Sequence, residues 1–341
     1  MLNFYLFTNS PGEVYSWVKP VSLALGSTFE ESRIYVFLTP CQYATGNERN
    51  VCLNFDYITK VFSPIETIKY QFFSDFESGF VFYLGGDPAY AKRFAKRTQS
   101  DFLAYSENKL NTKGIHFYQQ KSRVLDLMKS GLSPFPIEQK KGVVLLPGSR
   151  PDHLKVALPI MLDIVNDEAV TVMLSPFSNP SELMTIQTKF PNIKLQVLND
   201  VSDLGKFKYA LTIPGTNTMQ LAYLSVPFMM IFPTHDSSVL RLDGLFGLFL
   251  HLPIIGLILK RIILNIAIKQ KRFYALPNLY FNEYVCPELV GAFNINQARL
   301  QWGNFINDDQ KYLDCLSKFS ELQNIHDPVP DFVNYIKKKI N

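Results

Sequence analysis

Several widespread catalytic signatures are missing from this sequence of 341 residues. It contains no G-x-x-x-x-G-K-[ST] loop for nucleoside triphosphates and no G-x-G-x-x-G fingerprint for dinucleotides. It also lacks the G-x-S-x-G turn that exposes the nucleophilic serine of many hydrolases. These absences disfavour a P-loop ATPase, a nicotinamide-dependent enzyme and a serine hydrolase.

Cysteine and histidine are scarce, with four and five residues respectively. Cys41, Cys52, Cys286 and Cys315 form no C-x-x-C pair, and the histidines form no H-E-x-x-H helix or three-histidine cluster. The sequence therefore predicts neither a zinc site nor a disulfide framework. We expect the protein to work in a reducing compartment and without a metal.

The sequence has only a small excess of positive charge. The formal net charge is +4, the pI is near 8.7, and no dense run of Lys and Arg is interleaved with aromatic residues. Nucleic acid is therefore not an expected partner. The N-terminal stretch MLNFYLFTNSPGE has neither the basic region nor the long apolar run of a signal peptide, so we expect a cytoplasmic protein.

The sequence does contain an alternation of strand-like and helix-like segments, which predicts parallel sheets covered by helices. Strand-like runs lie at residues 2–7, 33–39, 80–84, 143–146, 169–176 and 193–200. A charged, proline-broken stretch near residues 119–141 is typical of a linker. We therefore predict two Rossmann-like domains at residues 1–138 and 139–319, with a C-terminal helix at 320–341 packing back on the first.

Two strand-like runs in the second half end in similar glycine turns, at Pro147-Gly148-Ser149-Arg150 and at Pro214-Gly215-Thr216-Asn217. Parallel strands would bring both turns to one edge of the sheet, where ligands bind in open α/β folds. The free N–H groups of the following helices and the guanidinium of Arg150 could hold a diphosphate there. The alternative is ordinary turn chemistry, in which Arg150 is a solvated surface charge.

Three carboxylates follow predicted strands in the first half: Glu13, Asp87 and Glu107. A carboxylate at such an edge is a candidate general base for deprotonating a sugar hydroxyl, and Asp87 is preferred among the three. The alternative is that Asp87 only caps the helix that begins at Pro88, and that Glu13 only stabilises a first helical turn.

The segments LLPGSR (145–150), PGTNTMQLAYLSVPFMMIF (214–232) and ALPNLYFNEYVCPELVG (275–291) resemble lipid-A-disaccharide synthases in order and spacing. The first half matches only through Gly12-Glu13 and Asp87. The resemblance implies the α/β GT-B fold, with two Rossmann-like domains facing a cleft. It also implies transfer of an acylated glucosamine from a UDP-sugar to a lipid-linked acceptor, without a metal or cofactor.

The resemblance implies further that Arg150, with the backbone of Gly148 and Ser149, meets the diphosphate or sugar of the donor. Gly215, Thr216 and Asn217 would line the same site. Asn278 of the Leu-Pro-Asn motif and Glu288 of the Pro-Glu-Leu motif would complete it.

The sequence also departs from the family pattern. The family's Ser-Gly-Thr-x-Thr-x-Glu becomes Pro214 to Gln220, so the amide of Gln220 replaces an anionic partner of the ribose. In the acceptor loop, Gly12 and Glu13 are kept, but Ser16 and Trp17 replace a glycine and an aspartate. These differences indicate a divergent relative with another acceptor.

Residues 245–273 form an apolar segment followed by basic residues and contain no acidic residue. The uninterrupted part is too short to span a bilayer, and a monotopic contact with anionic lipids fits its composition. The alternative is a buried helical hairpin or a dimer interface.

Together these features predict an inverting glycosyltransferase on the cytoplasmic face of the membrane, with Asp87 or Glu13 as base and Arg150 at the leaving UDP. The alternatives are a non-catalytic nucleotide-sugar or lipid-binding relative and an enzyme resembling UDP-N-acetylglucosamine 2-epimerase. A homodimer is compatible with each of these three hypotheses.

Overall fold

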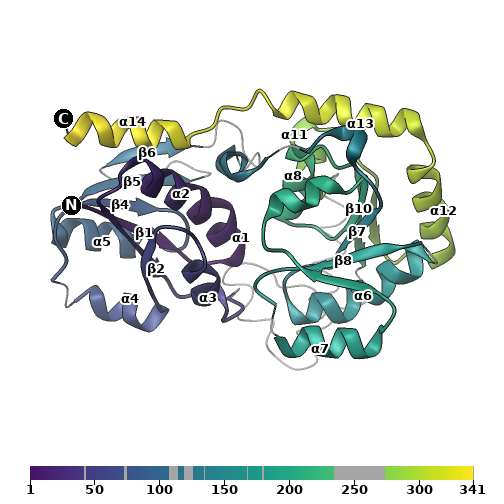
Figure 1. Ribbon diagram of the computed structural model, residues 1–341, viewed down its shortest axis with the longest axis horizontal. Coiled ribbons are helices and arrows are strands. Elements are labelled where there is room, and N and C mark those ends of the chain that lie inside the picture. The colour runs from purple at the N-terminus through teal and green to yellow at the C-terminus, as the bar shows by residue number, and fades with distance from the viewer. Residues whose placement is uncertain are drawn as a thin grey trace. The chain divides into compact units, whose positions relative to one another are not determined.

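The computed structural model describes residues 1–41, 44–72, 75–106, 114–118, 126–133, 135–166, 168–178, 180–233 and 273–340. The chain divides into two compact units (Figure 1). The first comprises Met1–Leu132 with Ile325–Asn341, and the second comprises Ser133–Asn324. Glu107 and residues 245–272 of the predicted membrane segment lie outside the described residues.

The first unit contains a six-stranded sheet in the order β3-β2-β1-β4-β5-β6, with every neighbouring pair parallel. Its strands are β1 (Leu2–Thr8), β2 (Ser32–Leu38), β3 (Ile58–Phe62), β4 (Phe80–Tyr83), β5 (Asp101–Ser106) and β6 (Ile115–Tyr118). The strand order reverses between β1 and β4, which is the position where open α/β sheets bind ligands.

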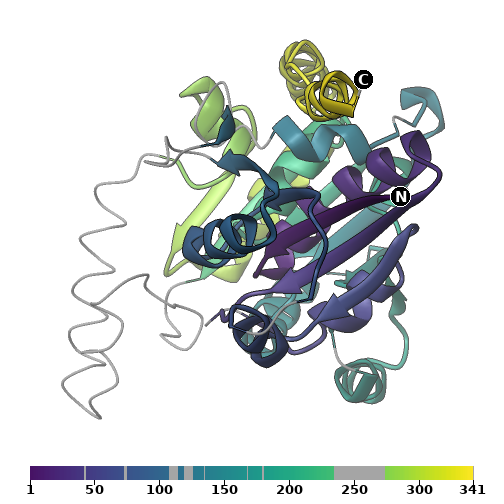
Figure 2. The ribbon, with the colours of Figure 1, turned by 90° about the vertical axis from the view of Figure 1, so that its left-hand side faces the viewer.

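Helices cover both faces of this sheet, as Figures 1 and 2 show. Alternate residues of β1 point to opposite faces, so Phe7 stacks on Phe37 on the side of α5, with Phe94 of that helix in contact. On the other face, Phe332 of the C-terminal helix packs on Phe82. The helices are α1 (Pro11–Glu13), α2 (Lys19–Thr28), α3 (Glu48–Leu53), α4 (Pro64–Tyr70), α5 (Pro88–Thr98) and α14 (Val329–Ile340).

A short π-helix, η1 (Val14–Val18), joins α1 to α2. Pro20 explains it, because proline has no N–H group to donate and its ring would clash with the carbonyl of Ser16 in a regular α-helix. The chain widens instead, and the N–H of Lys19 donates to the carbonyl of Val14, five residues back. The flaw that Pro20 introduces in the helical pattern thus becomes a local bulge next to Glu13.

The second unit repeats the same topology, with the order β12-β11-β10-β7-β8-β9 and parallel pairing throughout. Its strands are β7 (Val143–Leu146), β8 (Val170–Leu174), β9 (Lys194–Val197), β10 (Tyr209–Thr212), β11 (Phe228–Pro233) and β12 (Glu288–Gly291). The reversal of order falls between β7 and β10. The two sheets confirm the predicted α/β architecture.

The helices of the second unit are α6 (Pro151–Val165), α7 (Pro180–Lys189), α8 (Thr216–Tyr223), α11 (Leu276–Phe281), α12 (Ile295–Ile306) and α13 (Asp309–Leu322). Four single-turn or two-turn elements complete the described helices: the 3₁₀ segments η2 (Asp126–Gly131), η3 (Ile137–Gln139) and η4 (Val201–Lys206), with the π-helix η1. Among the residues described, no helix is both long and apolar enough to span a membrane.

Candidate functional site

Four of the predicted site residues follow the strands on either side of the two order reversals, whereas Asn278 lies in α11 and Glu288 begins β12. In the first unit, Glu13 follows β1 and Asp87 follows β4. In the second unit, Arg150 follows β7 and Gly215 follows β10. Because β1 pairs with β4 and β7 pairs with β10, each sheet brings its two turns together.

The Glu13 side chain reaches from the segment after β1 to the turn after β4. Ser10 and Glu13 form a capping box in which the N–H of Ser10 donates to Oε2 of Glu13 at 2.9 Å, and the N–H of Glu13 donates to Oγ of Ser10 at 3.4 Å. The Glu13 carboxylate also lies over Gly85, since a Cβ built on Gly85 would be 2.5 Å from its Cδ. Gly85 has a φ of +116°, so only glycine fits this approach without strain. Gly12 is half-buried within the same short helix.

Asp87 caps α5, with its Oδ1 accepting the N–H of Ala89 at 2.8 Å. Its side chain is exposed, and Oδ2 accepts no hydrogen bond from the described part of the chain. Both carboxylates act on Tyr83. Burial, and then the charges of Glu13 and Asp87, raise the pKa of Tyr83 to about 12. The two predicted base candidates therefore share one electrostatic environment, with Glu13 the more enclosed.

Three polar groups lie at the end of β1 and in η1; sequence reasoning missed Thr8 and Asn9 and noted Ser16 only as a departure from the family pattern. Oγ of Thr8, Oδ1 of Asn9 and Oγ of Ser16 are buried and have no hydrogen-bond partner among the described residues. Thr8 is 0% exposed and Ser16 is 3% exposed. Buried polar atoms normally have a partner, so these atoms are suited to a hydroxyl-rich ligand or to water. Pro20, four residues after Ser16, was the sequence signal that the helix is irregular at Ser16.

In the second unit, the turn after β7 begins α6. Gly148 has a φ of +102°, and Arg150 is the N-cap residue, half-buried, before Pro151 at the first helical position. The side chain of Arg150 does not cap the helix. The first N–H groups of α6 have no intrahelical acceptor, and Ser149 and Arg150 stand beside them. This turn has the donors that an anion requires.

The turn after β10 is held by its own side chains. The amide of Asn217 donates to Oγ1 of the buried Thr212, and Oγ1 of Thr218 donates to the carbonyl of Gly215 at 2.8 Å. Gly215 has φ 153° and ψ −174°, a conformation that essentially only glycine adopts. Thr218 also accepts the N–H of Leu276 at 3.1 Å, which ties α8 to the start of α11.

Thr216 and Gln220 are the candidates on α8 whose side chains make no hydrogen bond with the part of the chain that the structure describes. They lie four residues apart and therefore on one face of the helix. Gln220 is only 7% exposed, yet none of the described residues hydrogen-bonds its amide. Asn217, in contrast, has its amide nitrogen committed to the turn.

Asn278 is fully buried and closes the loop between α11 and β12. Its Nδ2 donates to the carbonyl of Cys286 and to Oε1 of Glu288, both at 2.8 Å. Its Oδ1 accepts the N–H groups of Val285 and Cys286, both at 2.9 Å. All of its hydrogen-bonding capacity is therefore used inside the protein, so its role in a donor site would be indirect.

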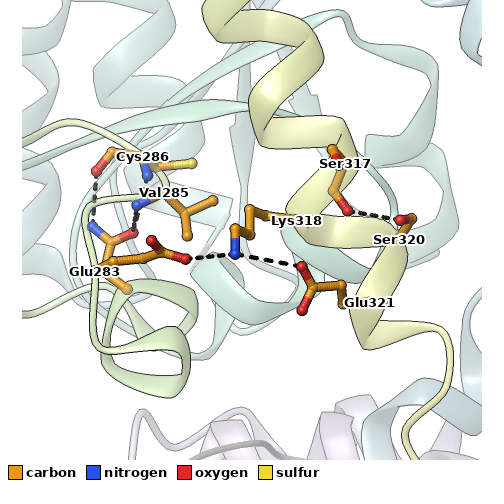
Figure 3. Close-up of polar contacts among 8 residues, drawn as sticks. Glu283, Val285, Cys286, Ser317, Lys318, Ser320 and Glu321 are labelled. Carbon is orange, nitrogen blue, oxygen red and sulfur yellow. Dashed lines mark hydrogen bonds and ion pairs between the residues drawn. The ribbon is translucent and has the colours of Figure 1, made fainter.

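Helix α13 supports the same loop from outside, as Figure 3 shows. Lys318 Nζ lies 2.8 Å from a carboxylate oxygen of Glu283 and 3.4 Å from one of Glu321. All three side chains are largely exposed, so this small network contributes little to stability.

Glu288 anchors the beginning of α11. Its Oε1 accepts from Ala275 N at 2.8 Å and from Asn278, while Tyr274 N donates to both oxygens, at 3.1 Å to Oε1 and 2.9 Å to Oε2. Burial raises the pKa of Glu288, and these hydrogen bonds oppose the rise. Oε2 is the less crowded oxygen and is the one that a ligand hydroxyl could reach.

Among the described residues, no group of three or more His, Cys, Asp or Glu side chains could hold a metal ion. Both carboxyl-edge sites are thus built from hydroxyls, amides, backbone N–H groups, one arginine and separate carboxylates. Such groups recognise sugars and phosphates through hydrogen bonds.

No protein-family model matches this sequence. No curated protein sequence matches it either. Solved structures are similar in fold. S. aureus MnaA, in a co-structure with UDP, has 13% identity and a TM-score of 0.54, and the match covers 100% of this chain and 97% of that one.

Acinetobacter baumannii MurG has 11% identity and a TM-score of 0.52, covering 99% of this chain and 100% of that chain. A putative UDP-N-acetylglucosamine 2-epimerase from Listeria monocytogenes has 11% identity and a TM-score of 0.52, covering 99% and 96%. At these identities the likeness concerns the fold alone. The chain has the α/β fold of the GT-B type, with two Rossmann-like units.

Proposed function

We propose that the protein is a glycosyltransferase resembling lipid-A-disaccharide synthases. It would transfer a glucosamine-type sugar from a UDP-sugar to a lipid-linked acceptor at the cytoplasmic face of the membrane. The observation that carries the proposal is the second order reversal, where Arg150 precedes α6 and Thr216 begins α8. No described residue hydrogen-bonds the side chains of Thr216 and Gln220.

The donor half of the proposal rests on charge. A leaving UDP carries a diphosphate that needs neutralisation, and we assign this role to Arg150 and the N–H groups of α6 and α8. Gln220 would hydrogen-bond a ribose hydroxyl. Ser149, Thr216 and the less crowded oxygen of Glu288 supply further polar contacts.

The acceptor half rests on the first unit. A sugar hydroxyl must lose its proton as it attacks the anomeric carbon, and Glu13 and Asp87 are the carboxylates near the first order reversal. Glu13 is half-buried and fixed by Ser10, whereas Asp87 is exposed and caps α5. We therefore assign the base to Glu13 first and to Asp87 second. Thr8 and Ser16 provide unused hydroxyls nearby in the same unit.

An epimerase of UDP-N-acetylglucosamine is the second candidate. It is favoured by the similarity in fold to a putative UDP-N-acetylglucosamine 2-epimerase. A non-catalytic relative that binds a nucleotide-sugar is the third, and it is favoured by the changed residues Ser16 and Trp17 in the acceptor loop. The three differ in what becomes of the bond between sugar and UDP.

The test is to incubate the purified protein with UDP-N-acetylglucosamine and with its acylated glucosamine derivatives, with and without a bacterial membrane lipid extract. Transfer releases free UDP only when lipid is present. Epimerisation leaves the sugar on UDP but changes the sugar proton spectrum, and a non-catalytic protein changes neither.

Glu13→Gln is the matched variant, because glutamine keeps the size and an oxygen acceptor for the N–H of Ser10 but cannot act as a base. Lipid-dependent UDP release that is lost in Glu13→Gln supports the proposal. Wild-type UDP release that is equal with and without lipid contradicts it.

A further inference from the structure

Helix α4 of the first unit, labelled in Figure 1, and the turn that follows it carry three exposed large apolar side chains. Ile65 is 81% exposed, Ile68 is 41% exposed, and Phe72, which follows the helix, is 59% exposed. Their spacing of three and four residues places them on one face of the helical turn. Large apolar side chains that gather on a surface mark a contact with another partner.

The inward side of the same helical turn contains two buried polar side chains. Thr67 is 0% exposed and Gln71 is 2% exposed. Oγ1 of Thr67 and both Oε1 and Nε2 of Gln71 have no hydrogen-bond partner among the described residues. Burying such groups is unfavourable, and a helix on a sheet normally turns its apolar residues inward. On α4, Tyr70 packs inward on Phe62, but Ile65 and Ile68 are exposed while Thr67 is buried. The outer face is therefore suited to an apolar environment.

Basic side chains border this apolar face. Helices α4 and α5 pack beside each other and together carry five basic residues and one acidic residue. The basic residues are Lys69, Lys92, Arg93, Lys96 and Arg97. The acidic residue, Glu66, accepts the N–H of Ser63 at 2.7 Å, and this bond lowers its pKa, so it stays ionised while capping the helix.

Two of the basic groups lie directly against the apolar face. The guanidinium carbon of Arg93 is 6.0 Å from the ring centre of Phe72. Nη1 of Arg97 donates to the carbonyl of Gln71 at 2.8 Å. Asp75 and Glu77, both exposed, are acidic residues that follow Phe72 in the sequence. The surface is therefore apolar in the centre and cationic at its border.

We propose that this α4–α5 surface docks on an anionic lipid bilayer. Ile65, Ile68 and Phe72 enter the boundary between headgroups and acyl chains, and the basic side chains meet anionic headgroups. Helix α4 begins where β3 ends, so its first residues lie at the carboxyl edge of the first sheet, the edge that Glu13 also follows. The proposal rests on these helices alone and does not depend on the donor chemistry of the second unit.

Vesicle flotation tests the proposal with the full chain. The wild type is expected to float with vesicles of phosphatidylcholine and phosphatidylglycerol and to float less at high salt. Because each basic residue near an anionic surface contributes about 1 kcal/mol, or about fivefold in partitioning, changing three should reduce it by about a hundredfold. The charge variant is Lys69→Gln with Arg93→Gln and Lys96→Gln.

The apolar variant is Ile65→Ser with Ile68→Ser and Phe72→Ser, which should also lose flotation. Matched controls change exposed side chains elsewhere: Leu300→Ser with Leu313→Ser, at 65% and 56% exposure, and Lys337→Gln with Lys338→Gln. The controls should float like the wild type.

A wild type that fails to float with anionic vesicles overturns the proposal. So does flotation that is unchanged in the charge variant, or that the controls lose equally. A wild type that floats equally with pure phosphatidylcholine shows that the basic border has no role and also overturns it. Unchanged tryptophan emission verifies that each variant is folded. If the apolar variant does not fold, the charge variant still decides the test.

Discussion

Replacing Asn278 by alanine should destabilise the second unit strongly. The side chain satisfies three backbone groups, which are the N–H groups of Val285 and Cys286 and the carbonyl of Cys286. Cys286 is 1% exposed, so water does not replace these bonds freely. A buried polar group left without a partner costs about 1–3 kcal/mol, and three of them correspond to about 3–5 kcal/mol once some water enters.

The two tryptophans allow each unit to be followed separately, because Trp17 lies in the first unit and Trp302, which is 2% exposed, lies in the second. Urea unfolding in a Trp17→Phe background would report the second unit alone. Asn278→Ala should lower the free energy of unfolding of the second unit by about 3–5 kcal/mol. Asn296→Ala, at an exposed position of α12, is the matched control and should change it by less than about 0.5 kcal/mol.

A second substitution at this position tests the same reasoning through pH. Asn278→Asp places a carboxylate where Nδ2 now donates to Glu288, so the two acidic groups repel in the folded state. The pKa of the new carboxyl should be raised by folding, so stability relative to the wild type should fall as pH rises above about 4, the usual pKa of an aspartate. If Asn278→Ala and Asn296→Ala unfold at the same urea concentration, the hydrogen bonds do not hold this loop and the reasoning fails.

Two further predictions concern Lys140 and Gly85. Burial lowers the pKa of Lys140 from 10.5 to about 8, so the unfolded chain binds its proton more tightly; stability of the second unit should therefore rise between those pH values relative to Lys140→Met. Parallel pH profiles of the two proteins would contradict this. Gly85→Ala should cost the first unit about 1–3 kcal/mol, seen in the emission of its tryptophan, because the new methyl meets Glu13. Gly46→Ala is the control for backbone strain alone, since Gly46 has a φ of +90° and no atom within 4 Å of the added carbon; equal losses would exclude a role for the clash.

The architecture could be predicted because buried parallel strands have a distinct composition. The run Val143–Leu146 ends at Pro147 in the sequence and β7 ends at Leu146 in the structure. The glycine turns after β7 and β10 were also visible, and parallel pairing brings strand ends to one edge. Ser10-x-x-Glu13 is a capping-box pattern that the sequence displays, although it does not show that the Glu13 carboxylate also covers Gly85.

The assignment of individual side chains could not be predicted in the same way. Asn278 and Gln220 are both amides in motifs that resemble a donor site. The amide of Asn278 is fully hydrogen-bonded within the loop before β12, whereas the amide of Gln220 has no partner among the described residues. This difference depends on which backbone groups the folded chain places near each amide, and that is a tertiary property without a local sequence signal.

The central claim is that the second order reversal binds the nucleotide part of a sugar donor. The most direct measurement is calorimetric titration of UDP into the wild type, Arg150→Ala and Gln220→Leu. We expect one site per chain in the wild type. Loss of charge-assisted hydrogen bonds worth about 1.5–3 kcal/mol should weaken binding about 10- to 150-fold in Arg150→Ala, with a smaller loss in Gln220→Leu. A wild type that does not bind UDP, or an Arg150→Ala variant that binds it equally well, would contradict the account.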